Sequence, residues 1–202
     1  MENVKGSLSH RQRQALVTQQ IILDAARELF LEQGYGTTTI DAISAKAGVA
    51  VSTVYSIYKN KRGILKAIRE AWHQESGQRE IYKLALQEPN PQRRIELAAN
   101  ATRRQWETSA TMMTVYNSAA AVDSEAAAEL KEALAGRRRN LATFIEETAS
   151  MLRPGLNMQH ATAIYLALTQ PEVFQELVEV FGWSPDEYET WLAETLKQQL
   201  LP

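Results

Sequence analysis

The sequence predicts an all-α protein, with a small N-terminal domain followed by a larger helical C-terminal domain. Apolar residues recur at helical spacing along most of the 202 residues, whereas no stretch alternates as a half-buried strand would. Capping and turn-forming residues cut the chain into short helices before residue 66 and into longer ones after it. We place the domains at residues 1–60, with 1–10 as a disordered tail, and at residues 61–202.

Composition narrows the class of protein. The chain contains no cysteine, which excludes disulfides and thiolate metal sites and favours a reducing cytoplasm. No apolar run approaches the roughly 18 residues of a membrane span, and the N-terminus lacks an apolar signal core. Residues 1–66 carry 9 Lys and Arg against 5 Asp and Glu, a charge of +4, whereas residues 67–202 carry 13 against 19, a charge of −6. A basic segment on an acidic chain predicts attraction to phosphate at one end of the protein.

Two short helices joined at a glycine are predicted near residue 48. The first has one apolar face, and Thr38 or Thr39 can cap its start; that face carries Ile40, Ile43 and Ala47. Gly48 suits the left-handed residue that ends a helix and turns the chain. Apart from the apolar Val54 and Ile57 and two tyrosines, residues 50–58 carry small or hydroxylated side chains, which let a helix approach base edges closely. The layout predicts a helix-turn-helix, which places its second helix in the DNA major groove.

The start of the next helix adds two cations. Asn60 can cap this helix, and Lys59 and Lys61 flank it, so two ammonium groups lie near a helix N-terminus. This combination suits a phosphate group.

This segment resembles the tetracycline-repressor (TetR) family of bacterial transcription regulators over roughly residues 16–66. The matching positions are Ile22, Ala25, Ala26, Leu29, Phe30, Gly34, Tyr35, Thr39, Ile40, Ile43, Ala47, Gly48, Val49, Thr53, Tyr55, Lys59, Asn60, Lys61 and Leu65. Three positions depart from the family pattern: Ala50 replaces a capping Ser, Ser52 replaces Gly, and Tyr58 replaces Phe. The first departure weakens the cap of the second helix by about 1 kcal/mol.

The resemblance and the side-chain chemistry together predict the residues that contact double-stranded DNA. Val51, Ser52 and Ser56 suit base edges, and Val51 in particular suits a thymine methyl group. Phosphate contacts carried over from matching family positions are Thr39, Thr53, Tyr55 and Lys61. Lys46 and Lys59 are weaker candidates, for which plain solvation is the alternative. The basic residues near the N-terminus could enter a minor groove, unless this terminus is disordered; they are Lys5, His10, Arg11 and Arg13.

Helical patterning continues through the C-terminal domain. A helix runs past Trp72, and Pro91 opens another, with one face formed by Ile95, Ala98, Ala99, Thr102 and Trp106. A shorter apolar piece is expected around Met112, Met113 and Tyr116. A long helix is expected from about Ser124 to Pro154, with inward residues Leu130, Leu134, Leu141, Phe144, Ile145 and Leu152. Capping boxes at Thr169–Glu172 and Ser184–Glu187 predict two last helices.

The resemblance also implies a small-molecule effector and a homodimer. Aromatic and Met side chains suit an adaptable apolar pocket, and the candidates are Trp72, Trp106, Met112, Met113, Tyr116, Phe144 and Met151; packing alone is the alternative for each. Two apolar stripes are candidates for the dimer interface, with monomer core as the alternative: Ile164, Tyr165, Leu168, Tyr188, Trp191, Leu192, Thr195 and Leu196. Arg103 and Arg104 could meet an anionic ligand or form a solvated edge, and Arg137, Arg138 and Arg139 are expected on the surface.

These patterns and the family resemblance together imply a cytoplasmic, sequence-specific transcriptional regulator, most simply a repressor that a small-molecule ligand releases from a palindromic operator. The alternative is a DNA-binding regulator of the same fold that a protein partner controls, or that has no effector. An enzyme is not expected, because His10, His73 and His160 are scattered and no nucleophile elbow or phosphate-binding glycine loop occurs. No cofactor and no metal are therefore predicted.

Overall fold

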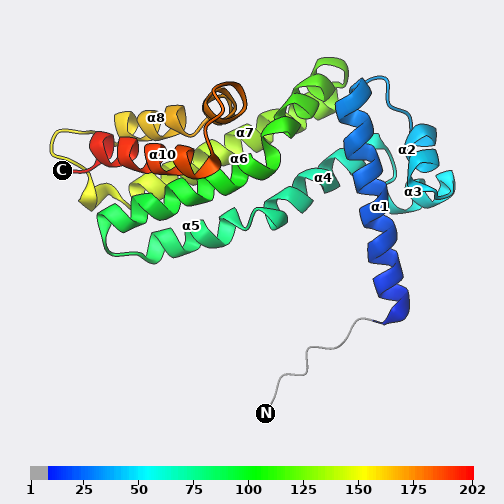
Figure 1. Ribbon diagram of the computed structural model, residues 1–202, viewed down its shortest axis with the longest axis horizontal. Coiled ribbons are helices and arrows are strands. Elements are labelled where there is room, and N and C mark those ends of the chain that lie inside the picture. Colours follow the sequence, from blue (N-terminus) through cyan, green and yellow to red (C-terminus); the bar gives the residue numbers. More distant parts are fainter. Residues whose placement is uncertain (1–8) are drawn as a thin grey trace, which may run out of the picture. The chain divides into compact units, whose positions relative to one another are not determined.

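The computed structural model describes residues 9–202, and of residues 109–112 it describes the backbone alone. Within these residues every regular element is a helix, which confirms the all-α class (Figure 1). Packing divides the chain into two units, Met1–Arg69 and Glu70–Pro202, which we call the head and the body. This division falls after Arg69, inside a helix that begins at Lys61. The domain limit expected from the sequence, residue 60, lies in the turn before that helix.

The head is built from three helices and the start of a fourth: α1 (His10–Gln33), α2 (Ile40–Ala47), α3 (Val51–Tyr58) and α4 (Lys61–Glu75). Helix α1 begins with a capping box between Ser9 and Gln12, so residues 9 and 10 of the expected tail are ordered, whereas Lys5 lies outside the described residues. The fully buried side chains form one apolar centre: Ile22, Ala26, Phe30, Ile43, Val54, Ile64, Leu65 and Ile68. This centre fixes the orientation of α3 within the head.

The turn between α2 and α3 forms as the sequence predicted. The Thr39 hydroxyl accepts a hydrogen bond from the Ala42 N–H at 3.1 Å, and Gly48 ends α2 in the left-handed conformation. The Ser44 hydroxyl donates to the Val49 carbonyl at 2.6 Å and closes the turn. Ala50 offers no side-chain cap to α3, and Asn60 accepts from the Gly63 N–H at 2.9 Å at the start of α4.

The body is a bundle around one long helix, α6, which packs against α5, α7, α9 and α10. Figure 1 shows α5, α6, α7, α8 and α10 running along the same axis of this unit. Its elements are α5 (Gln78–Gln87), α6 (Pro91–Val122), α7 (Ser124–Glu146), a 3-10 turn (Ala149–Met151), α8 (Met158–Leu168), α9 (Pro171–Phe174), a π-helical turn (Gln175–Val180) and α10 (Pro185–Leu200).

Three predicted elements differ from the structure. The predicted face from Ile95 to Trp106 is buried, but α6 does not stop there, because no Gly or Pro interrupts residues 92–122. Helix α7 ends at Glu146 rather than at Pro154. There the Thr148 N–H bonds to the Ile145 carbonyl at 3.0 Å, which tightens the last turn.

The third difference concerns the two predicted capping boxes. Thr169 does not cap α9: its hydroxyl donates to the Tyr165 carbonyl at 2.8 Å, and Gln170 is the residue at the cap position. The second box is confirmed, because Ser184 and Glu187 bond reciprocally at the start of α10.

Candidate functional site

Helix α3 presents a polar face to solvent. Ser52, Tyr55 and Ser56 are exposed, whereas Val54 on the opposite side is only 1% exposed and packs in the head core. Val51 and Thr53 are half-buried at the first turn. The expected base and phosphate contacts on this helix therefore lie at its outward face or at the edge of that face.

The far end of α3 is tied to α1. The Tyr58 hydroxyl donates to the Gln19 carbonyl at 3.1 Å, and burial raises the Tyr58 pKa to about 12. Tyr58 therefore stays a neutral donor at physiological pH. The family departure at this position, Tyr in place of Phe, thus adds a hydrogen bond that a Phe could not make.

Lys61 makes more contacts within the head than the sequence suggested. Its ammonium donates to the carbonyls of Gly36 and Thr38 at 3.3 and 2.9 Å and to that of Tyr35 at 2.5 Å, all in the segment after α1. The same ammonium lies 4.3 Å from the centre of the Tyr35 ring. Three carbonyls use the three donors of an ammonium. This geometry favours a positioning role, and the predicted phosphate contact of Lys61 would compete with these bonds.

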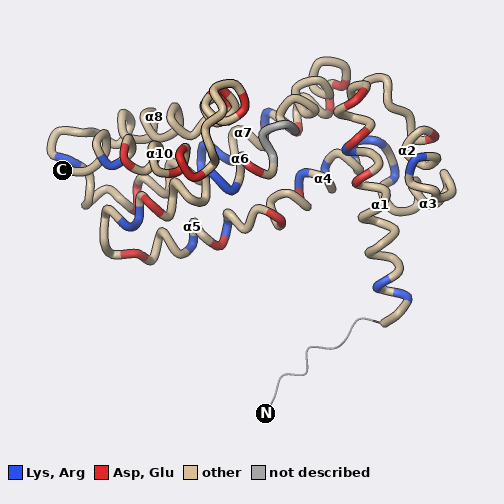
Figure 2. The backbone as a smooth tube through the Cα atoms, in the orientation of Figure 1, with Lys and Arg blue, Asp and Glu red and all other residues tan. Residues whose placement is uncertain are grey.

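Figure 2 marks the positions of Lys and Arg in blue and those of Asp and Glu in red along the backbone. The other two lysine candidates differ from Lys61 and from each other in their contacts. Lys46 pairs with Glu28 at 2.7 Å and Glu32 at 3.8 Å, and the hydrogen bond that it donates to Glu28 raises the Lys46 pKa. Lys59 is exposed and ends α3 with a φ of 65°, the one positive value at a non-glycine position within the described chain. Lys59 is therefore more accessible to a phosphate than Lys46. Thr39, the remaining candidate, is exposed, and while its oxygen caps α2 its hydroxyl proton can still be donated.

A cluster of polar side chains lies inside the body, among otherwise apolar neighbours. The Tyr82 hydroxyl bonds to the hydroxyls of Thr102 at 3.1 Å and Tyr165 at 2.9 Å. Arg137 donates to the Thr169 hydroxyl at 3.0 Å and to the Thr169 carbonyl, and the guanidinium carbon lies 5.4 Å from the centre of the Trp106 ring. Arg137 is thus largely buried rather than on the surface, which corrects the sequence prediction.

Burial controls the electrostatics of this cluster. It lowers the pKa of Arg137, and it raises the pKa of both Tyr165 and Tyr188. A guanidinium nevertheless stays charged, because its ordinary pKa is far above neutrality. The cluster therefore combines one buried positive charge with neutral phenols.

The predicted pocket residues fall into two groups. Trp106 and Phe144 are buried in the main core of the body, and Met113 and Met151 pack against this core as half-buried side chains. Trp72 and Tyr116 are buried but do not belong to that core cluster. Met112 lies outside the described side chains. The structure therefore brings four of the candidates to one core, and this core also contains Tyr165 and Tyr188.

Burial divides the predicted dimer residues equally. Four are completely enclosed by their own chain, which favours monomer core for them: Tyr165, Tyr188, Leu192 and Leu196. The other four keep part of their surface accessible: Ile164, Leu168, Trp191 and Thr195. A proposed interface has to rest on this second set. Beside Trp191, a shallow hollow is lined by Trp183, Asp186, Glu187 and Thr190.

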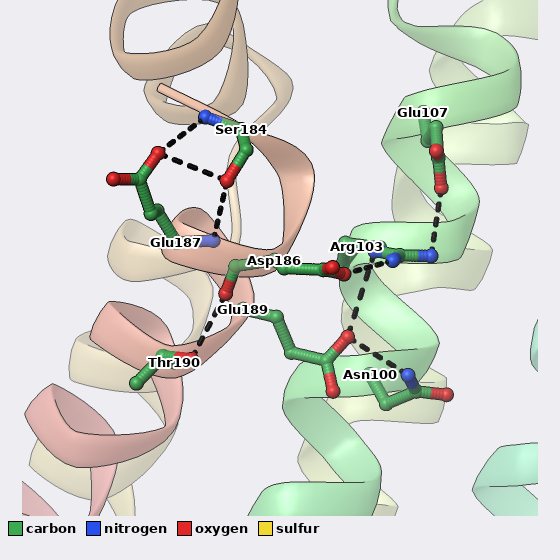
Figure 3. A network of polar contacts seen from close by, with 8 residues as sticks. All are labelled: Asn100, Arg103, Glu107, Ser184, Asp186, Glu187, Glu189 and Thr190. Atoms are coloured by element: carbon green, nitrogen blue, oxygen red, sulfur yellow. Dashed lines mark hydrogen bonds and ion pairs between the residues drawn. The ribbon is translucent and has the colours of Figure 1, made fainter.

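Arg103 belongs to an ionic network between α6 and α10 (Figure 3). It pairs with Glu107 at 2.9 Å, with Glu189 at 3.5 Å and with Asp186. Glu189 also accepts from the Asn100 amide at 2.8 Å. Three carboxylates neutralise this guanidinium, so Arg103 has no charge left over for an anionic ligand. Arg104 is exposed, as expected for a solvated edge.

Sequence reasoning missed Arg137 because it treated three consecutive arginines as one charged run. The signal was present in the helical spacing: Arg137 precedes Leu141 by four residues and Phe144 by seven, which places all three on one face. Arg138 and Arg139 point elsewhere and are exposed, whereas Leu134, expected inward, is 40% exposed. Within the described residues no group of three or more His, Asp or Glu side chains could hold a metal ion.

The geometry defines a helix-turn-helix protein whose second unit is an all-helical bundle. Residues 22–68 match the model of the bacterial regulatory proteins of the tetR family. Over this N-terminal segment, the chain is similar to the tetR family of regulators.

Curated relatives match in the same region. The chain is 41% identical over 51 residues to the HTH-type transcriptional regulator YvkB of Bacillus subtilis and 41% identical over 59 residues to the TetC protein of transposon Tn10 from Escherichia coli. These matches cover 25% and 29% of this chain, and they span only 27% and 30% of the length of the relatives.

Solved structures match over nearly the whole chain. SmeT in complex with triclosan has a TM-score of 0.73 at 20% identity, with 92% of each chain covered. The regulator FadR from Bacillus subtilis in complex with stearoyl-CoA has a TM-score of 0.65 at 19% identity and covers 88% of this chain and 96% of its own. At such low identity these likenesses establish the shared fold of both units. Within the described residues, no helix is long and apolar enough to span a membrane.

Proposed function

We propose that this protein is a sequence-specific, DNA-binding transcriptional regulator that acts in the cytoplasm as a homodimer. In this proposal it is a repressor that a small-molecule ligand releases from a palindromic operator. The observation that carries the proposal is the outward face of α3, where Ser52, Tyr55 and Ser56 are exposed while Val54 anchors the helix from behind. The family match over residues 22–68 supports the same role for this helix.

Each contact has a chemical role in this proposal. Ser52 and Ser56 donate to or accept from base edges in the major groove, and Val51 packs against a thymine methyl group. The hydroxyls of Thr39, Thr53 and Tyr55, with the exposed Lys59, hold phosphates on either side. Lys46 and Lys61 support the head from within through their own contacts.

We include a dimer in the proposal because the DNA-contacting face of α3 is small. One recognition helix reads only a few base pairs, so two-fold symmetry is the usual way to lengthen the site. The part-exposed side chains Ile164, Leu168, Trp191 and Thr195 form the candidate contact between subunits. The effector would bind in the body core near Trp106 and Phe144, and it would have to favour one spacing of the two heads over the other.

Selection of bound duplexes from a random DNA library by the purified full-length protein tests the proposal. We expect enrichment of a palindrome with half-sites about one helical turn apart. Val51→Ala should relax the preference at one base position, whereas Lys59→Ala should weaken all sequences and lower the salt slope by about one. Absence of any enriched sequence would contradict the proposal.

A further inference from the structure

Three arginines of the body are partly or largely buried, and they are compensated in different ways. Arg103 faces three carboxylates, and Arg94 uses Nε and both terminal nitrogens on three backbone carbonyls. Arg137 has only Thr169 and the face of Trp106 as close partners, and its Nε has no hydrogen-bond partner. Within the described residues, no carboxylate lies within ion-pair distance of Arg137; the exposed Glu172 acts on it only from farther away. Arg137 is therefore a buried charge without a counter-charge.

Such a charge is costly in a folded protein. A buried ion normally has a partner of opposite sign or a full set of hydrogen bonds, because removal from water otherwise penalises it strongly. Structural packing alone would select an apolar residue here, since Leu141 and Phe144 occupy the same face of α7. A charge kept at such a position points to a function that needs it.

A second unpartnered polar group belongs to the same cluster. Tyr188 is completely buried, and its hydroxyl makes no hydrogen bond. Tyr188 and Trp106, the ring against which the Arg137 guanidinium lies, belong to the same core cluster. A phenol that can donate a hydrogen bond and a guanidinium N–H that is free to donate thus occur together in one core.

The surroundings of these donors are aromatic. Phe174 lies 5.0 Å from the Tyr188 ring, and Phe144 lies 5.5 Å from the Tyr165 ring, measured between ring centres. Trp106 forms the platform below the guanidinium. A guanidinium and a phenol hydroxyl among aromatic side chains match a ligand with one anionic group and an apolar skeleton.

We propose that the effector is an amphipathic organic anion, whose carboxylate binds Arg137 and Tyr188 and whose apolar part packs against Trp106, Phe144 and Phe174. This inference rests on the proposed small-molecule control of the protein and names the class of ligand. The carboxylate accepts from the Nε–H of Arg137 and from the Tyr188 hydroxyl, so both unpartnered donors become satisfied. The ligand thus supplies the counter-charge that the fold does not.

A purely structural role for Arg137 makes a different prediction. Its bond to the Thr169 carbonyl caps the C-terminus of α8, where a cation is favourable, but Trp106 also donates to that carbonyl at 3.0 Å. A capping role would change stability on substitution and leave ligand selectivity unaltered. Selectivity between a carboxylate and its alcohol is therefore the discriminating measurement.

The experiment uses the full-length protein and two matched probe pairs: octanoate with octanol, and naphthoate with naphthalenemethanol. Binding is followed by titration calorimetry and by tryptophan emission, since Trp106 borders the site. The wild type should bind at least one carboxylate about tenfold to a hundredfold more tightly than its alcohol. Arg137→Met should abolish this preference, and Tyr188→Phe should reduce the preference by about tenfold.

Arg138→Met is the matched control. The Arg138 side chain is exposed, and its substitution removes the same positive charge from the chain. It should keep the full preference for the carboxylate. Equal binding of carboxylate and alcohol, a preference that survives in Arg137→Met, or no binding of either carboxylate up to about 1 mM would overturn the assignment. These titrations contain no DNA, so a failed operator selection with intact carboxylate binding would refute only the proposed function.

Discussion

Arg94 and Arg137 lie in the same bundle, and both donate to carbonyls at helix C-termini, yet they differ in how fully they are used. Arg94, at the start of α6, bonds to the carbonyls of Leu86, Glu88 and Glu147 at 3.1, 2.9 and 2.7 Å. These bonds join the end of α5 to the end of α7. Arg137 bonds to one residue and keeps an unpartnered nitrogen. A buried guanidinium with all three nitrogens engaged holds the fold together, whereas one with an unpartnered nitrogen is available for a ligand.

The largest expected effect is the difference in stability between Arg94→Met and Arg137→Met. Arg94→Met leaves three carbonyls at two helix ends without their donor, and we expect a loss of about 3 kcal/mol in the free energy of unfolding. Arg137→Met removes an uncompensated charge and should change this free energy by less than about 1 kcal/mol in either direction. Urea unfolding followed by tryptophan emission measures both, since all four tryptophans lie in the body.

The exposed Arg138→Met serves as the reference for both variants. Equal destabilisation by the Arg94 and Arg137 substitutions would contradict the proposed difference between them, because Arg137 would then stabilise the fold as much as Arg94 does. A higher free energy of unfolding in Arg137→Met than in the wild type would show that the Arg137 charge destabilises the fold, in contrast to the charge of Arg94.

Lys61 extends the comparison to the head, where it resembles Arg94 rather than Arg137. Lys61→Met should cost about 2 kcal/mol of head stability, because three carbonyls after α1 lose a charged donor. Hydrogen exchange of peptides from α1 and α4 in the full-length protein measures this loss. Lys66→Met is the control, since Lys66 is exposed on the same helix.

DNA binding gives an independent check on Lys61. If Lys61 positions the head, its substitution should weaken binding to every sequence, while the dependence of affinity on salt stays that of the wild type. A salt slope smaller by about one would instead assign Lys61 to a phosphate.

How much the sequence could predict depends on whether local or distant groups decide a residue's role. The turn of the helix-turn-helix, the cap at Thr39 and the box at Ser184 depend on residues within a few positions, and each was predictable. Thr169 fits the same local pattern, but a guanidinium 32 positions earlier bonds to it, and its hydroxyl donates back into α8. Lys61 likewise bonds to carbonyls more than 20 positions away. Tertiary partners of this kind leave no local signal.

A smaller effect on stability is expected in helices α2 and α3 of the helix-turn-helix, because a side chain caps α2 and none caps α3. Thr39→Ala should destabilise the head by about 1 kcal/mol, since the Ala42 N–H loses its acceptor. Ala50→Ser should add a cap to α3 and stabilise the head by about 0.5–1 kcal/mol. Thr39→Ser keeps the hydroxyl and should behave as the wild type. Hydrogen exchange of the α2 and α3 peptides measures all three variants, and a stabilising effect of Thr39→Ala would contradict the capping role.

The smallest expected effect concerns pH, and it falls on exposed ion pairs of the body rather than on its buried arginines. Hydrogen bonds from Lys197 and then Arg93 hold the Glu96 pKa below its usual 4.5, so this group stabilises the fold above that pH. The contribution is lost as pH falls through the lowered folded-state pKa. The hydrogen bonds that Lys197 donates to Glu194 and Glu96 raise the Lys197 pKa above 10.5, so its contribution is present below that value and lost at higher pH.

Glu96→Gln should therefore flatten the decline in stability between about pH 5 and pH 3, with Glu179→Gln, an exposed carboxylate, as the control. Urea midpoints measured across this range decide the matter. If the stability of Glu96→Gln declined with falling pH as steeply as that of the wild type, other carboxylates would be responsible for the acid sensitivity. Arg137→Met should change this dependence little, because within the described residues no carboxylate is paired with Arg137 and the exposed Glu172 acts on it only from farther away.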